Sequence, residues 1–118
     1  MYKSIIQKDT SRCLICHSNT WLEWHHVFGA ALKKKSEEHG LMVRLCHYCH
    51  NEPPYGVHQD RERRRKLQAL AQEKAMEKYG WSTEDFIKEF YKNYLGGRVA
   101  KRNGISVVNF VDNERAEM

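Results

Sequence analysis

The sequence predicts an α+β domain in which two short strands come before two longer helices. Strands are expected at residues 21–28 and 41–45, where aromatic and β-branched residues are concentrated. Helices are expected at residues 60–79 and after residue 82, where apolar side chains recur at three- and four-residue spacing. Two Cys-x-x-Cys pairs flank the strands, which predicts that a metal ion holds the fold together.

The composition indicates one small, positively charged domain. A chain of 118 residues with 30% charged residues leaves a modest apolar core, which a metal would help to stabilise. Lys and Arg outnumber Asp and Glu by 20 to 15, which favours a polyanionic partner, although a soluble basic protein has the same excess. No signal peptide or membrane-spanning apolar run is present, so we expect a cytoplasmic protein without a membrane partner. The oligomeric state is left open.

The four cysteines form two pairs, Cys13 with Cys16 and Cys46 with Cys49. Each tight turn holds two sulfurs on one side, and two such turns supply the tetrahedral thiolate set of structural zinc. In a reducing cytosol this spacing favours zinc ligands over disulfides. The alternative replaces one cysteine by His17, His47 or His50, but we expect His17 and His47 to contact a thiolate or solvent instead.

The first strand carries two adjacent histidines, His25 and His26. In a regular strand, successive side chains face opposite sides, so Glu23 and His25 share one face while Trp24 and His26 share the other. A bulge or turn at His26 or Gly29 would change the direction of these rings. His50 directly follows the second cysteine pair, so closing the zinc site would bring it close to the two histidines.

The segments between these motifs also indicate local structure. Lys33, Lys34 and Lys35 begin a loop or short helix that ends at Gly40. Residues 51–56 contain two prolines and a glycine, which exclude a continuous helix.

The helix predicted at 60–79 begins with a basic cluster, which comprises Arg61, Arg63, Arg64 and Arg65. Cations at a helix N-terminus oppose the macrodipole. The cluster therefore predicts an anionic partner, or else a solvated face that is tolerated at small cost.

Gly80 ends this helix, and Ser82 with Asp85 predicts a capping box at the next one. Its buried face is expected to comprise Phe86, Ile87, Phe90, Tyr91, Tyr94 and Leu95. Residues 1–95 should form a single domain, with the motifs in residues 13–58 and the helical part in 59–95. Residues 96–118 are expected to be a tail, in which 105–111 could add an edge strand, bind a partner or stay flexible.

The order of these motifs resembles the HNH endonucleases of the ββα-metal (His-Me finger) superfamily. The likeness covers about residues 13–58: a CxxC pair, His-His at the end of a strand, then a hydrophobic strand running into Leu-Cys-x-x-Cys-His. The longer pattern Glu-Trp-His-His-Val-Phe, Lys-Lys-Ser-Glu and Gly-Val-His is similar to small HNH proteins of phages and prophages. For the fold, the resemblance implies a small zinc-stapled ββα-metal (HNH) core with two additional C-terminal helices.

For the function, the resemblance implies a metal-dependent endonuclease that hydrolyses DNA phosphodiester bonds. It gives His26 the role of general base, and makes His25 and His50 ligands of a catalytic divalent metal that His58 or Asn51 would complete. Imidazole ligands suit Mn, Ni, Co or Zn at least as well as Mg. The lysines at 33–35 and the basic cluster would then contact the DNA backbone.

The sequence departs from the family pattern at one point. The asparagine usually found a few residues before the third cysteine falls near Leu41, so the support that it gives to the general base comes from another residue or is missing. The alternative function is a non-catalytic zinc-knuckle module that binds nucleic acid or a protein. The residue that separates the two is His26, since a binding module has no use for an unliganded histidine beside a metal.

Overall fold

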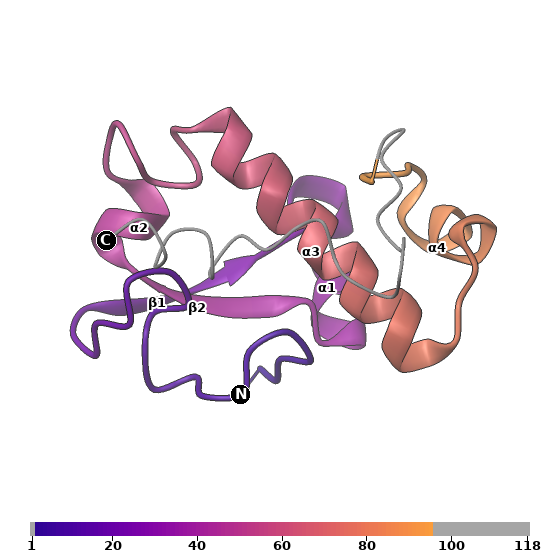
Figure 1. Cartoon of the computed structure of the whole chain (residues 1–118), viewed down its shortest axis with the longest axis horizontal. Helices are drawn as coiled ribbons and strands as arrows, with labels where there is room; N and C mark the ends of the chain where they lie inside the picture. Colours follow the sequence, from indigo (N-terminus) through magenta and orange to yellow (C-terminus); the bar gives the residue numbers. More distant parts are fainter. Residues whose placement is uncertain (1, 96–118) are drawn as a thin grey trace, which may run out of the picture.

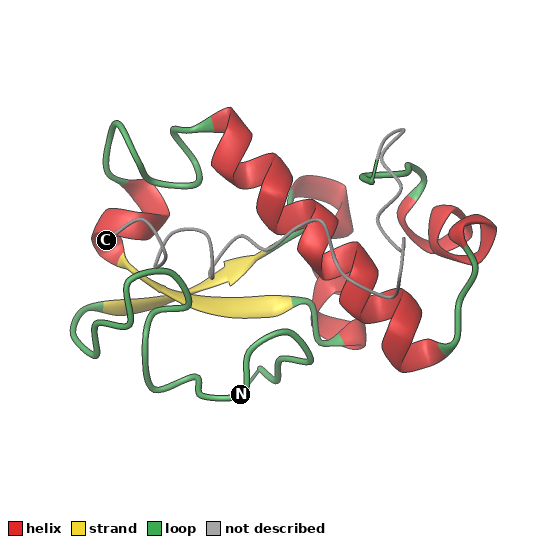
Figure 2. Ribbon diagram, in the orientation of Figure 1, coloured by secondary structure: helices red, strands yellow, loops and turns green. Residues whose placement is uncertain are grey.

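The computed structural model describes residues 2–95, which form an α+β fold as predicted (Figure 1). The strands are β1, Leu22–His26, and β2, Met42–Cys46; between them a 3-10 turn, Ala30–Leu32, leads into α1, Lys33–His39 (Figure 2). The helices after the sheet are α2, His47–Asn51, α3, Arg61–Tyr79, and α4, Thr83–Phe90. The strand considered at 105–111 lies outside the described residues. No helix within residues 2–95 is long and apolar enough to cross a membrane.

The sheet consists of β1 and β2 paired antiparallel, with His25 opposite Val43 and His26 opposite Met42. The N-terminal segment covers the outer edge of β2: Gln7 Oε1 accepts a hydrogen bond from Arg44 N at 2.8 Å, and Leu14 N donates to Arg44 O at 2.9 Å. These bonds satisfy the backbone groups of an edge strand, which otherwise pair with other chains. Gln7 is itself buried, a position that the sequence analysis did not predict.

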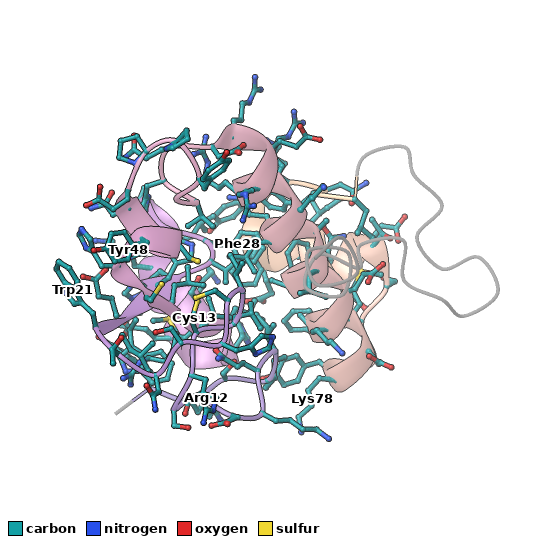
Figure 3. All side chains as sticks on the ribbon, turned by 60° about the vertical axis from the view of Figure 1, so that its left-hand side comes forward. Arg12, Cys13, Trp21, Phe28, Tyr48 and Lys78 are labelled. Carbon is teal, nitrogen blue, oxygen red and sulfur yellow. The ribbon has the colours of Figure 1, made fainter. Side chains whose placement is uncertain are left out.

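The core lies between the sheet and the helices, where α3 runs across the sheet and α4 packs on α3 (Figure 1). Its largest buried side chains include Phe28, which Figure 3 labels, and Phe86 and Phe90, and these three rings contact one another. The buried face predicted for α4 is wrong at two positions, Ile87 and Tyr91, which are 36% and 69% exposed. For Tyr91 the reason is that α4 ends at Phe90 and Tyr91 adopts a left-handed conformation, which turns the chain away from the helix axis, whereas Ile87 lies within α4 on its outer side.

The ends of α3 and α4 are set by capping residues, of which Gly80, Ser82 and Asp85 were expected and Asp60 was not named. Asp60 accepts hydrogen bonds from the backbone N–H groups of Glu62 and Arg63, and Gly80 closes α3 in the left-handed conformation. Ser82 and Asp85 form the predicted capping box of α4. A cap of this kind stabilises a helix by about 1 kcal/mol. Here the caps fix where α3 starts, and with it the position of the basic cluster.

Candidate metal centres

The two cysteine pairs meet at one end of the sheet. Cys13 and Cys16 come from an N-terminal turn, Cys46 ends β2, and Cys49 lies on α2. The four Sγ atoms lie within 4.8 Å of one another, none is in a disulfide, and Cys16 Sγ is 3.6 Å from Cys46 Sγ. Two sulfurs bound to one tetrahedral zinc lie about 3.8 Å apart, so the cluster could hold a structural metal such as zinc. Figure 3 shows Cys13 beside other sulfur atoms in the interior.

The electrostatics of this cluster favour a bound cation. A hydrogen bond from Cys49 lowers the pKa of Cys13 to about 4, whereas burial raises the pKa of Cys16 to about 11. The pKa of Cys49 is also raised, first by its hydrogen bond with Cys13 and then by burial. The Cys13 thiolate therefore forms readily while Cys16 and Cys49 keep their protons, because burial and the nearby negative charge of Cys13 disfavour further thiolates. A divalent cation would offset these charges and allow all four thiols to ionise.

A second cluster is made of three histidines from three elements: His25 on β1, His50 on α2, and His58 in the turn that follows. One ring nitrogen from each lies within 4.8 Å of the others, and the Nε2 atoms of His50 and His58 are 3.0 Å apart. His25 is buried, and its Nε2 has no hydrogen-bond partner among the described residues. Because buried polar atoms normally have a partner, this nitrogen fits the role of a metal ligand.

The surroundings of the three rings also suit metal binding. Burial, followed by the charges of the neighbouring histidines, lowers the pKa of His25 to about 3, so its ring is neutral near pH 7. The pKa of His58 is lowered as well, again first by burial. Glu23 Oε1 lies 2.6 Å from His50 Nδ1, which places a proton on Nδ1 and leaves the Nε2 lone pair free for a metal.

The turn at residues 52–58 delivers His58 to this cluster. Gly56 N donates to Glu52 O, and His58 N donates to His50 O at 3.1 Å, which folds the turn back against α2. A Cβ atom at Gly56 would lie 2.6 Å from Glu52 N, so only glycine fits here. Between the two candidates left open by the sequence, His58 is the residue whose ring joins the cluster, while Asn51 Oδ1 accepts from Gln59.

His26 lies on the opposite face of β1, as strand alternation predicted. Its Nε2 is 2.7 Å from Glu37 Oε2 on α1, and its ring contacts the edge of the Tyr2 ring. The side chain is 21% exposed, so its other nitrogen is within reach of solvent or a ligand. Glu37 thus holds the ring in place, a contact that the sequence analysis did not predict.

His47 belongs to neither cluster, as expected. Its Nδ1 is 3.2 Å from Glu23 Oε2, its Nε2 is 2.7 Å from Glu52 Oε2, and its ring stacks on Trp21 at the molecular surface (Figure 3). The hydrogen bond with Glu23 is the main reason that the pKa of His47 is raised. Glu23 therefore joins α2 to β1 through two histidines at once.

The predicted DNA-contacting residues differ in their surroundings. Lys33 and Lys34 are exposed, while Lys35 Nζ lies 3.1 Å from Glu89 Oε1. In the basic cluster, Arg61 and Arg65 are exposed, and Arg63 Nε lies 3.8 Å from Asp60 Oδ2. Arg64 Nη1 donates to Val57 O at 3.1 Å and to His58 O at 3.4 Å, which places its charge next to the histidine cluster.

No protein-family model, curated protein sequence or solved structure matches this chain.

Proposed function

We propose that this protein is a metal-dependent endonuclease of the HNH type, which hydrolyses phosphodiester bonds in DNA. The observation that carries the proposal is the buried Nε2 of His25, which has no partner among the described residues, lies within a cluster of three imidazoles and directly precedes His26 in the chain. Three imidazole nitrogens suit Mn, Ni, Co or Zn, and Mg binds them less readily. A divalent metal held there would stabilise the negative charge on the phosphate and the leaving oxygen.

His26 is the proposed general base. The Glu37 carboxylate accepts a hydrogen bond from Nε2–H of His26, and in this tautomer the Nδ1 lone pair is free to take a proton from the attacking water. Glu37 also fixes the orientation of the ring, so that the base need not be ordered at each turnover. A metal at the cysteine site would have a structural role, since it would cross-link the N-terminal turn, the end of β2 and α2.

The alternative is a non-catalytic zinc-knuckle module that binds nucleic acid. It is favoured by one observation: the His26 ring faces Glu37 and Tyr2 and not the other three histidines. For catalysis, the DNA would have to contact the metal at the histidine cluster on one face of β1 and His26 on the other face. The scissile phosphate would therefore have to lie at the C-terminal end of β1, where α1 and the sheet meet. For binding alone, no such requirement exists.

The two functions are separated by the variant His26→Ala. Plasmid and single-stranded DNA are incubated with the zinc-loaded protein and with Mg, Mn, Ni, Co or Zn. We expect wild-type protein to cut, and His26→Ala to bind DNA with unchanged affinity while cutting roughly a hundredfold more slowly, the scale of a lost general base. His25→Ala should instead regain part of its activity at high metal concentration. Equal rates for wild type and His26→Ala, or no cutting with any metal, would leave the binding module as the function.

A further inference from the structure

A polar pocket of about 300 Å³ lies at the start of α3. Four cationic side chains line it, Arg61, Arg64 and Arg65 from α3 and Lys92 from the segment after α4, together with Asn93 and Tyr94. Within residues 2–95, no carboxylate lies within ion-pair distance of these four cations. The pocket therefore gathers positive charge that the described chain does not neutralise.

The fold builds this pocket from two distant segments. Gln72 on α3 is fully buried, and its Nε2 donates to Asn93 Oδ1 at 3.0 Å while its Oε1 accepts from Tyr94 N at 2.7 Å. These bonds hold the segment after α4 against α3. Lys92 Nζ then lies 5.2 Å from the centre of the Tyr94 ring, a cation–π contact that holds the ammonium group beside the arginines.

This arrangement is unfavourable unless an anion binds. Like charges in one pocket repel each other, and the three arginines also lie in the first turns of α3, where the helix dipole disfavours cations. A phosphate group offsets both effects, and the planar guanidinium group can bind two of its oxygens at once. The buried hydrogen bonds of Gln72 hold Lys92 beside the arginines of α3. The positive charges therefore line a defined pocket and are not spread over a solvated helix face.

Arg64 connects this pocket to the histidine cluster, because it lines the pocket and also donates to the backbone oxygen of His58. We propose that the pocket binds one backbone phosphate of the DNA strand that is cut at the histidine cluster, at a fixed number of nucleotides from the cut. This inference rests on the proposed function for the identity of the strand. The binding of phosphate by the pocket does not depend on it.

The phosphate site is tested without any cutting. Inorganic phosphate is titrated into the zinc-loaded protein, and the arginine Nε–H signals are followed by NMR. We expect saturable shifts of the Arg61, Arg64 and Arg65 signals, and affinity about tenfold weaker in Lys92→Ala. The control is Lys78→Ala, at the far end of α3, which removes the same charge outside the pocket (Figure 3). Absence of saturable binding, or equal affinity in Lys92→Ala and wild type, would overturn the site.

The position of the phosphate relative to the cut is tested with oligonucleotides that carry one neutral methylphosphonate linkage. Wild-type protein should cut poorly at one fixed distance from the neutral linkage, and Lys92→Ala should lose this pattern. If the positions of the cuts do not depend on the neutral linkage, the proposed placement of the phosphate relative to the cut is wrong. The endonuclease function is not affected by that outcome. If the protein binds phosphate through Lys92 but cuts no DNA, the endonuclease function fails and the phosphate site stands.

Discussion

Glu23 contacts two histidines of α2 with its two carboxylate oxygens: Oε1 lies 2.6 Å from His50 Nδ1, and Oε2 lies 3.2 Å from His47 Nδ1. Burial raises the pKa of this carboxyl, but the hydrogen bonds with His50 and His47 outweigh burial and lower it overall. Glu23 is thus ionised near pH 7, and it both sets the tautomer of His50 and fixes the position of α2 on β1.

Glu23→Gln should weaken metal binding at the histidine cluster about tenfold or more, since the ionised partner of a metal-binding histidine is lost. The structural zinc should be unaffected. Calorimetric titration of the zinc-loaded variant with Co²⁺ or Mn²⁺ measures this change. Glu38→Gln, an exposed site on α1, is the matched control. Unchanged Co²⁺ affinity in Glu23→Gln would mean that Glu23 only packs α2 against the sheet.

The loop glycine offers a second test of the same cluster. In Gly56→Ala, the new Cβ would lie 2.6 Å from Glu52 N, so the turn must shift at a cost of about 1–3 kcal/mol and carry His58 away from His50. We expect a lower Tm and a loss of Co²⁺ binding at the histidines, with the structural zinc retained. Gly29→Ala is the control, because a Cβ at that position would have no atom within 4 Å and its φ is negative. If Gly56→Ala binds Co²⁺ as wild type does, His58 is not a ligand.

Local patterns are sufficient to predict much of this molecule. The period of two along β1 places His25 and His26 on opposite faces, and the CxxC spacing brings the four cysteines together. Asp60 and Ser82 mark the starts of two helices, because the side chains of Asp and Ser accept from the free N–H groups of a first turn. The strand alternation and the caps depend on residues that are near one another in the chain, and the two CxxC pairs meet because all four thiols suit one metal ion.

The remaining features depend on distances that one sequence does not specify. Glu37 reaches His26 only because residues 33–39 form a helix and not the loop that the sequence equally allowed. Lys92 joins the arginines of α3 because α4 stops at Phe90, where sequence periodicity continued the helix to residue 95. In both cases tertiary packing decides which of two local conformations forms, and side chains far apart in sequence meet as a result.

Removal of the structural metal should unfold the protein. Cys13 and Cys46 are buried within the apolar core, so the metal site and the core form together. Binding of structural zinc contributes about 10–16 kcal/mol in small zinc domains, which is comparable to the whole stability of a domain of this size. A strong chelator, or Cys46→Ser, should therefore abolish the cooperative thermal transition measured by circular dichroism. A chelated protein that still melts cooperatively at the wild-type Tm would contradict a structural role for this metal.

The lysines of α1 should contribute unequally to DNA binding. Lys33 and Lys34 are exposed, whereas the charge of Lys35 is already paired with Glu89. Each lysine that contacts a phosphate should contribute about 0.9 to the slope of log affinity against log salt concentration. Lys33→Ala combined with Lys34→Ala should lower the slope by nearly 2, and Lys35→Ala should change it little. Fluorescence anisotropy with labelled duplex DNA measures the slopes, and equal effects of all three lysines would show that Glu89 releases Lys35 when DNA binds.

Glu37 should act as a positioning residue for His26. The variant Glu37→Ala removes the acceptor of the Nε2 proton, so the ring can rotate and change tautomer, and we expect kcat to fall about tenfold or more while KM is unchanged. Glu37→Gln keeps an oxygen acceptor at the same place and should recover much of the rate. If Glu37 only stabilised the fold, Glu37→Ala would lower the Tm. A loss of kcat at unchanged Tm that Glu37→Gln restores would therefore contradict a purely structural role.

Combining the variants tests whether Glu37 acts through His26. In a protein that already carries His26→Ala, the further change Glu37→Ala should have no effect on kcat, because the group that it positions is gone. Two effects that multiply in the double variant would show that Glu37 contributes independently of His26. Glu38→Ala, one residue along α1, removes the same charge from an exposed position and should leave kcat at the wild-type value.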